Sequence, residues 1–86
     1  MNWLFTGLSA YRCGEYELAR DLIGSAMKSQ EIAEVYGWLG HCYLSAIFTK
    51  QGNTIAAESA MNAAKEIEEK DVEEFIEELV AYKVPE

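Results

Sequence analysis

Residues 3–26, WLFTGLSAYRCGEYELARDLIGSA, decide the fold of this chain, because their pattern occurs a second time. Residues 36–64, YGWLGHCYLSAIFTKQGNTIAAESAMNAA, place aromatic, glycine and alanine residues in the same order, with five extra residues in the middle. Matching positions lie 33 residues apart before this insertion and 38 residues apart after it. A repeat of this length is typical of stacked helical hairpins. The matching pairs are Trp3 and Tyr36, Gly7 and Gly40, Ala10 and Tyr43, Gly14 and Gly52, Ala19 and Ala57, Ile23 and Met61, and Ala26 and Ala64.

Apolar spacing predicts that most of the chain is helical. Apolar residues follow an i, i+3, i+4 pattern from about residue 2 to 13 and again from 16 to 28, and Gly14 separates the two where a helix C-terminus favours a left-handed residue. A longer apolar stripe predicts a third helix of about five turns that ends before Asn53. Asn53 or Thr54 can cap a fourth helix by accepting a hydrogen bond from its first free amides. The predicted fold class is therefore all-α.

Two arrangements fit the residues that follow the fourth helix. The helical spacing of apolar residues is interrupted before Val72, which lies five positions after Ile67. Asp71 with Glu74 resembles a capping pair, so we expect a separate fifth helix at about 71–82. One continuous helix accommodates the same residues, because no glycine or proline lies between residues 54 and 84. The sequence alone leaves this choice open.

The charge of the chain argues against a nucleic-acid partner. Its 86 residues include 15 acids and 7 bases, a net charge of −8, whereas nucleic-acid binding needs clustered Lys and Arg. Eight of the acids lie between residues 65 and 78, where they form either a solvated helical face or an attractive surface for a basic partner. No run approaches the ~20 apolar residues of a membrane span, and the first residues lack the basic region of a signal peptide. We expect a cytoplasmic protein without a membrane partner.

No combination of residues in the sequence predicts catalysis or a metal site. His41 and Cys42 are adjacent, so on a helix they point about 100° apart, and zinc needs three or four converging ligands. Cys13 and Cys42 belong to no CxxC pair and fit apolar helical positions. The sequence contains a single histidine, and it completes no recognisable Ser-His-acid or Cys-His arrangement. No glycine-rich phosphate loop is present. We expect a protein that is not an enzyme and that needs no cofactor and no metal.

The two matching stretches resemble tetratricopeptide repeats. Both carry features of that family's consensus: an aromatic residue, a glycine one turn later, a turn glycine and small residues in the second helix. The first stretch has the Gly-acid-Tyr turn of the family as Gly14-Glu15-Tyr16, and the second has the Leu-Gly pair as Leu39-Gly40. The family's closing proline is absent from both. A generic helical bundle is the alternative to this resemblance.

The resemblance implies a right-handed array of two helical hairpins with a fifth, capping helix. The implied single domain covers residues 1–86, with a first repeat at about 2–29, a second at about 31–68 with an extended hairpin, and a C-terminal helix at about 71–82. Gly7 and Gly40 would leave room for the partner helices at Ala19 and Ala57. The insertion would lengthen the second hairpin and expose its apolar residues.

In arrays of this family the first helices of the repeats line a concave surface, which implies a binding wall here. Arg12 would orient a carboxylate on that wall, and the insertion would add an exposed apolar contact. The expected partner-binding residues are Leu4, Leu8, Tyr11, Arg12, His41, Leu44, Ile47 and Phe48. The alternative is that the fifth helix of the chain itself covers Leu8, Tyr11 and Leu44.

The sequence thus predicts a non-catalytic adaptor or small chaperone that binds an amphipathic helix or an apolar segment of a partner protein. The competing hypothesis is a self-assembling module that forms dimers or larger homo-oligomers through its groove or extended hairpin. Two repeats favour this alternative, because three or more usually sustain a helical array.

Overall fold

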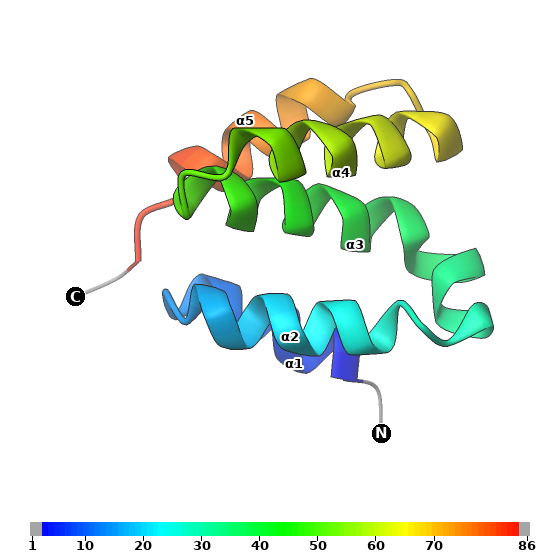
Figure 1. The fold of residues 1–86 in the computed structure, drawn as a ribbon, viewed down its shortest axis with the longest axis horizontal. Helices are drawn as coiled ribbons and strands as arrows, with labels where there is room; N and C mark the ends of the chain where they lie inside the picture. The colour runs from blue at the N-terminus through cyan, green and yellow to red at the C-terminus, as the bar shows by residue number, and fades with distance from the viewer. Residues whose placement is uncertain (1–2, 85–86) are drawn as a thin grey trace.

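The structure is a computed structural model that describes residues 3–84, and these residues form five helices and no strand (Figure 1). The predicted all-α class is confirmed for this part of the chain. Residue 2, where the first helix was expected to begin, lies outside the described residues. The helices are α1 (Trp3–Arg12), α2 (Tyr16–Ala26), α3 (Gln30–Lys50), α4 (Thr54–Ile67) and α5 (Val72–Ala81).

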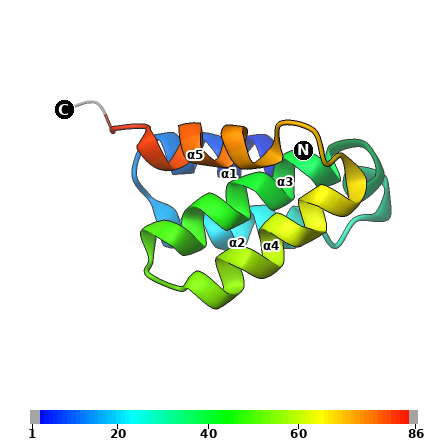
Figure 2. The ribbon, with the colours of Figure 1, turned by 90° about the horizontal axis from the view of Figure 1, so that it is seen from above.

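Helix α3 is the centre of the molecule and packs against all four other helices. Helices α1 and α2 form one hairpin, and α3 and α4 form another. Along the long axis α1, α3 and α5 run in one direction and α2 and α4 in the other (Figure 1). Seen from above, α1 and α5 lie on one side of α3, while α2 and α4 lie on the other (Figure 2). Two helices distant in sequence, α1 and α5, therefore flank the same face of α3.

Glycine shapes the turn inside each hairpin. Gly14 has φ +83° and Gly52 has φ +77°, a left-handed conformation that costs a residue with a side chain about 1–2 kcal/mol. In each turn the amide of the residue after the glycine donates to the carbonyl five residues earlier, at 2.9 Å in the first and 2.8 Å in the second. This is the Schellman arrangement, which satisfies carbonyls that a helix end leaves free. The matching glycines of the sequence repeat thus end α1 and α3 in the same way.

Helix α4 begins at an asparagine cap. The Oδ1 atom of Asn53 accepts a hydrogen bond from the amide of Ala56 at 3.1 Å, so Asn53, one of the two candidates from the sequence, is the cap.

The break between α4 and α5 is present, but it is not capped as expected. Glu68 is extended, with φ −149° and ψ 101°, and Asp71 is left-handed with φ 67°. The side chain of Asp71 makes no capping hydrogen bond, so the predicted capping pair is wrong. The Nε1 atom of Trp38 in α3 instead donates to the carbonyl of Glu68 at 3.0 Å. A contact from a distant helix therefore stabilises the break.

Close helix packing at two glycines is confirmed, but the neighbours differ from those expected. A Cβ atom on Gly7 would lie 2.6 Å from Cγ1 of Ile23 in α2, not against Ala19. A Cβ atom on Gly40 would lie 2.6 Å from Sδ of Met27, just after α2, so this glycine faces the first hairpin and not Ala57 of its own. Gly40 therefore allows the two hairpins to approach each other.

None of the helices within residues 3–84 is both long enough and apolar enough to cross a membrane.

Candidate functional site

A cavity of about 440 Å³ lies between α1 and α5, with α3 at its floor. We call it the α1–α5 groove. The lining residues come from α1, from α3, and from α5 with the residue that follows it: Leu8, Tyr11, Arg12, Leu39, Tyr43, Phe75, Glu78, Leu79 and Tyr82. On each helix they are separated by one turn, so they share a face. This face is mainly apolar and aromatic.

Aromatic rings link the walls of the groove to its floor. The rings of Tyr11 and Tyr43 meet edge to face at a centroid distance of 5.5 Å, and Tyr43 meets Phe75 in the same manner at 6.1 Å. Phe75 also stacks on Trp38 at a centroid distance of 5.1 Å. Such pairs stabilise packing by about 0.5–1.5 kcal/mol beyond their buried area. The rings therefore fix α1 and α5 relative to α3.

One hydrogen bond joins the two walls directly. The hydroxyl of Tyr11, whose side chain is 1% exposed, donates to the carbonyl of Leu79 at 2.6 Å. This carbonyl lies in the last turn of α5, where helical carbonyls need partners from elsewhere, and it also accepts from the amide of Tyr82. Burial raises the pKa of Tyr11 to about 12. The phenol is thus a neutral donor that holds the C-terminal end of α5 against α1.

Arg12 places a positive charge at the edge of the groove. Its Nη2 atom donates to the hydroxyl of Tyr43 at 3.2 Å, and its guanidinium carbon lies 5.8 Å from the centroid of the Tyr82 ring, within cation–π range. Within residues 3–84 it forms no ion pair, although acids outnumber bases two to one in this chain. The guanidinium therefore keeps its charge available at this edge.

The structure brings together three of the residues predicted for the binding wall. Leu8, Tyr11 and Arg12 line the groove, whereas His41 and Leu44 do not. His41 is half-buried, and burial lowers the pKa of its imidazole below the ordinary value. Its neighbour Leu44 is also half-buried and packs against the hydrophobic core. Of the predicted wall, Leu8, Tyr11 and Arg12 of α1 therefore lie together at the groove, whereas His41 and Leu44 of α3 lie outside it, and the binding role of these residues stays a prediction.

The expected exposure of the insertion is wrong. Ile47 is fully buried in the core, and Phe48 is half-buried. Leu4 of α1 is fully buried as well. The reason is that Ile47 lies one helical turn after the buried Tyr43, so lengthening α3 continues its core-facing stripe. Neither Leu4 nor Ile47 can contact a partner unless the fold rearranges.

Helix α5 forms one wall of the groove through Phe75 and Leu79. The repeat pattern did not predict this wall, and only the alternative in which the fifth helix covers Leu8, Tyr11 and Leu44 placed this helix near α1. The alternative that α5 covers the wall is correct for Tyr11, which Leu79 contacts. Leu8 remains half-buried and accessible from the groove. Leu39 and Tyr43 are four residues apart, and this helical spacing was the sequence signal for the floor.

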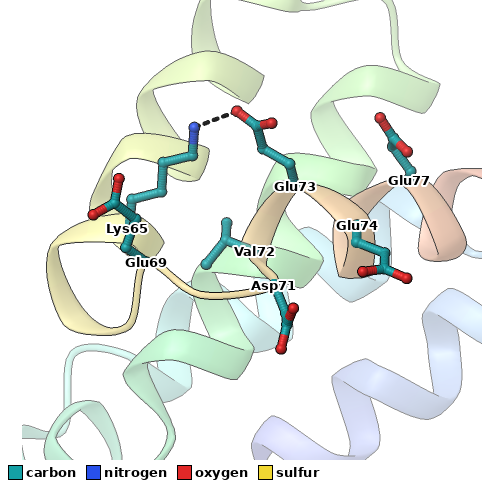
Figure 3. A pocket seen from close by; sticks show the side chains of 7 residues that line it. All are labelled: Lys65, Glu69, Asp71, Val72, Glu73, Glu74 and Glu77. Carbon is teal, nitrogen blue, oxygen red and sulfur yellow. Dashed lines mark hydrogen bonds and ion pairs between the residues drawn. The ribbon is translucent and has the colours of Figure 1, made fainter.

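A second hollow, of about 460 Å³, is acidic (Figure 3). Its lining residues are Val72, one lysine and five acids: Lys65, Glu69, Asp71, Glu73, Glu74 and Glu77. Lys65 donates to Glu73, and this hydrogen bond lowers the pKa of the Glu73 carboxyl below its ordinary value. Figure 3 shows the Lys65 side chain reaching Glu73, whereas Glu74 points away from it. In the described part of the chain no three His, Cys, Asp or Glu side chains are grouped so that they could hold a metal ion.

The two cysteines occupy different environments. Cys13 is exposed and Cys42 is fully buried, and burial raises the pKa of the Cys42 thiol to about 11. The neutral thiol of Cys42 therefore behaves as a small apolar core residue.

Comparisons with known proteins found no relative of this chain. No family model matches the chain, and no curated protein and no solved structure matches it.

Proposed function

We propose that this chain is a non-catalytic protein-binding module that holds an amphipathic helix or apolar segment of a partner in the α1–α5 groove. The observation that carries the proposal is the lining of this groove, where three helices present apolar and aromatic side chains beside a guanidinium that forms no ion pair within residues 3–84. Leu8, Leu39 and Phe75 are only half-buried there, so their remaining surface is free to contact a partner. Helix-in-groove recognition uses apolar anchors of this kind.

The arrangement of the helices supports the same proposal. Helices α1, α3 and α5 run in one direction, and α1 and α5 flank one face of α3 (Figure 2). In a tetratricopeptide-like array these would be the helices that line the concave surface, with α5 in the position of the next first helix. We include this repeat-like, right-handed packing in the proposal.

The composition of the lining favours binding over chemistry. Tyrosine and arginine are the residue types most often found as interface hot spots, and Arg12 is exposed next to Tyr43 and Tyr82. The hydroxyl of Tyr11 is occupied by the Leu79 carbonyl. The adaptor or small chaperone of the sequence analysis remains the role that these residues suit best.

A display selection tests this function. A library of amphipathic helical peptides is selected on the immobilised chain, and the selected peptides are titrated by calorimetry against the wild type and two variants. Leu8→Ser removes an apolar anchor from the groove and should weaken binding by about tenfold, which corresponds to ~1.4 kcal/mol. Ile55→Ser is the matched control, because Ile55 lies on α4 and is 84% exposed.

Two results would contradict the proposal. One is a selection that enriches no peptide, and the other is an enriched peptide that binds Leu8→Ser as tightly as Ile55→Ser. A melting curve of each variant shows whether a loss of affinity reflects unfolding. Leu8→Ser is chosen because its side chain is only half-buried.

Self-assembly is the second candidate, and exposed apolar side chains of α1 favour it. Trp3 is 50% exposed and Phe5 is 47% exposed, while the Phe5 ring meets Tyr36 edge to face at 5.3 Å. A second copy of the chain could cover this surface. Light scattering over a concentration series distinguishes the two functions: a reversible dimer that Phe5→Ser abolishes supports self-assembly, and a monomer at every concentration excludes it.

A further inference from the structure

The two walls of the α1–α5 groove carry opposite charge. Helix α1, WLFTGLSAYR, contains no acid and ends in Arg12. Helix α5, VEEFIEELVA, contains four glutamates and no base. Because the walls belong to helices far apart in sequence, only the fold sets them opposite each other.

One of the four glutamates of α5 lines the groove, and a second lies one helical turn before it. Glu78 is the lining residue. Glu74 lies four residues earlier on the same face of α5, and it also lines the acidic hollow. Glu73 bonds to Lys65, and Figure 3 shows the Glu74 side chain pointing away from Glu73 and Glu77. Neither Glu74 nor Glu78 forms an ion pair within residues 3–84. Both carboxylates are exposed and available to a partner.

The wall formed by α1 carries a positive charge. Arg12 is exposed, is held by the Tyr43 hydroxyl and the Tyr82 ring, and has no acid paired with it in the described part of the chain. An occupant of the groove thus meets a cation along α1, acids along α5 and apolar side chains between them. Charges at the edge of an interface set orientation and association rate more than affinity.

We propose that the groove selects a helix whose two flanks carry opposite charge, with basic side chains against Glu74 and Glu78 and an acidic side chain against Arg12. This inference rests on the proposed helix-binding function and names the chemistry of the partner. The apolar face of the helix contacts Leu8, Leu39 and Phe75. The charged flanks then determine which way the helix runs in the groove.

Two synthetic helices of about 18 residues test this inference. Both contain the same apolar face and equal numbers of Lys and Glu, so they have the same composition and zero net charge. In the segregated probe all Lys lie on one flank and all Glu on the other, whereas in the mixed probe the two alternate on both flanks. Equal net charge removes the general attraction of this acidic chain for cations.

Calorimetric titration at about 50 mM salt, where exposed charges are weakly screened, should show the segregated probe binding about tenfold more tightly than the mixed one. The double variant Glu74→Gln with Glu78→Gln should reduce this preference to about twofold, which is what Arg12 alone supplies. The control variant Glu58→Gln with Glu66→Gln changes the net charge equally on α4 and should keep the full preference. At about 500 mM salt the preference should largely disappear.

The outcomes separate the two proposals. Equal binding of both probes to the wild type, with weaker binding to Leu8→Ser, overturns the charge inference and leaves the helix-binding groove intact. A preference that survives in Glu74→Gln with Glu78→Gln also overturns it, because the acids of α5 would then not be its cause. Absence of binding by either probe overturns the groove itself and this inference with it.

Discussion

Adding one methyl group at two glycines should have opposite effects on stability. A Cβ atom on Gly7 would lie 2.6 Å from Cγ1 of Ile23 and 3.2 Å from the backbone amide of the same residue. Ile23 is fully buried and its β-branched side chain has little rotameric freedom, so the two helices must separate. By contrast, a Cβ atom on Gly24 would meet no atom within 4 Å.

The magnitudes follow from these distances. Alanine improves the helix propensity of either position by about 1 kcal/mol at most, and forced overpacking in a core costs about 1–3 kcal/mol. Gly7→Ala should therefore destabilise the fold by about 1–2 kcal/mol, whereas Gly24→Ala should stabilise it by about 0.5–1 kcal/mol. In a domain of this size the melting temperatures should differ by roughly 10 °C.

Urea denaturation followed by far-ultraviolet circular dichroism measures both variants against the wild type. Each is a matched control for the other, because both replace a helical glycine with alanine. If Gly7→Ala is as stable as Gly24→Ala, the close approach of α1 and α2 at Gly7 does not exist and the packing argument fails. Gly40→Leu extends the test, since its Cβ atom would lie 2.6 Å from Sδ of Met27, and it should cost several kcal/mol.

Three further predictions concern single contacts. Arg12→Glu should weaken the binding of a selected helical peptide by about tenfold. The melting temperature should fall only slightly, because the exposed guanidinium forms no ion pair within residues 3–84 and loses only its contacts with the Tyr43 hydroxyl and the Tyr82 ring. Equal affinities of both proteins in calorimetry would show that this wall does not contact the peptide. Tyr11→Phe should cost about 1–2 kcal/mol through loss of the hydrogen bond to Leu79. Because the pKa of Tyr11 is raised to about 12 in the folded chain, the stability that Tyr11 contributes is complete below pH ~10 and is lost as the pH rises toward 12. The free energies of unfolding of wild type and Tyr11→Phe should therefore converge over this pH range. Two curves that stay parallel would contradict this prediction. Asp71→Gly should stabilise the chain by about 1 kcal/mol, because Asp71 has φ 67° without a capping bond; lower stability in urea denaturation would show that its side chain has another role.

The helices could be predicted from the sequence because their determinants are local. Apolar periodicity defines each stripe, while Gly14 and Gly52 end α1 and α3 through conformations that other residues rarely adopt. The sequence alone could not show whether α4 and α5 are separate helices or one continuous helix. No glycine or proline marks the break between them, and the contact that stabilises it comes from Trp38, thirty residues earlier in the chain.

The proposed binding wall could likewise be predicted only in part from the sequence. Leu8, Tyr11 and Arg12 could be predicted because one helical turn separates them and the repeat pattern assigns them a face. The burial of Ile47 also follows from local spacing, because Ile47 lies one helical turn after Tyr43, but the expectation that the insertion projects from the fold placed Ile47 at the surface. The sequence did not show that α5 forms the wall opposite α1, so His41 and Leu44 were expected at the groove and lie outside it. A helical stripe shows which residues share a face, and only packing shows what that face contacts.

The sequence by itself determined that this chain forms helices, where most of them begin and end, and that it carries an acidic C-terminal third. Only the tertiary structure decided that α5 lies across from α1, with Tyr11 bonded to Leu79 and with Glu78 and Arg12 on opposite walls of one groove. The physical reason is the range of the interactions involved. Helix formation depends on residues within a few positions of each other, whereas the groove depends on which apolar faces bury each other among helices up to 68 residues apart.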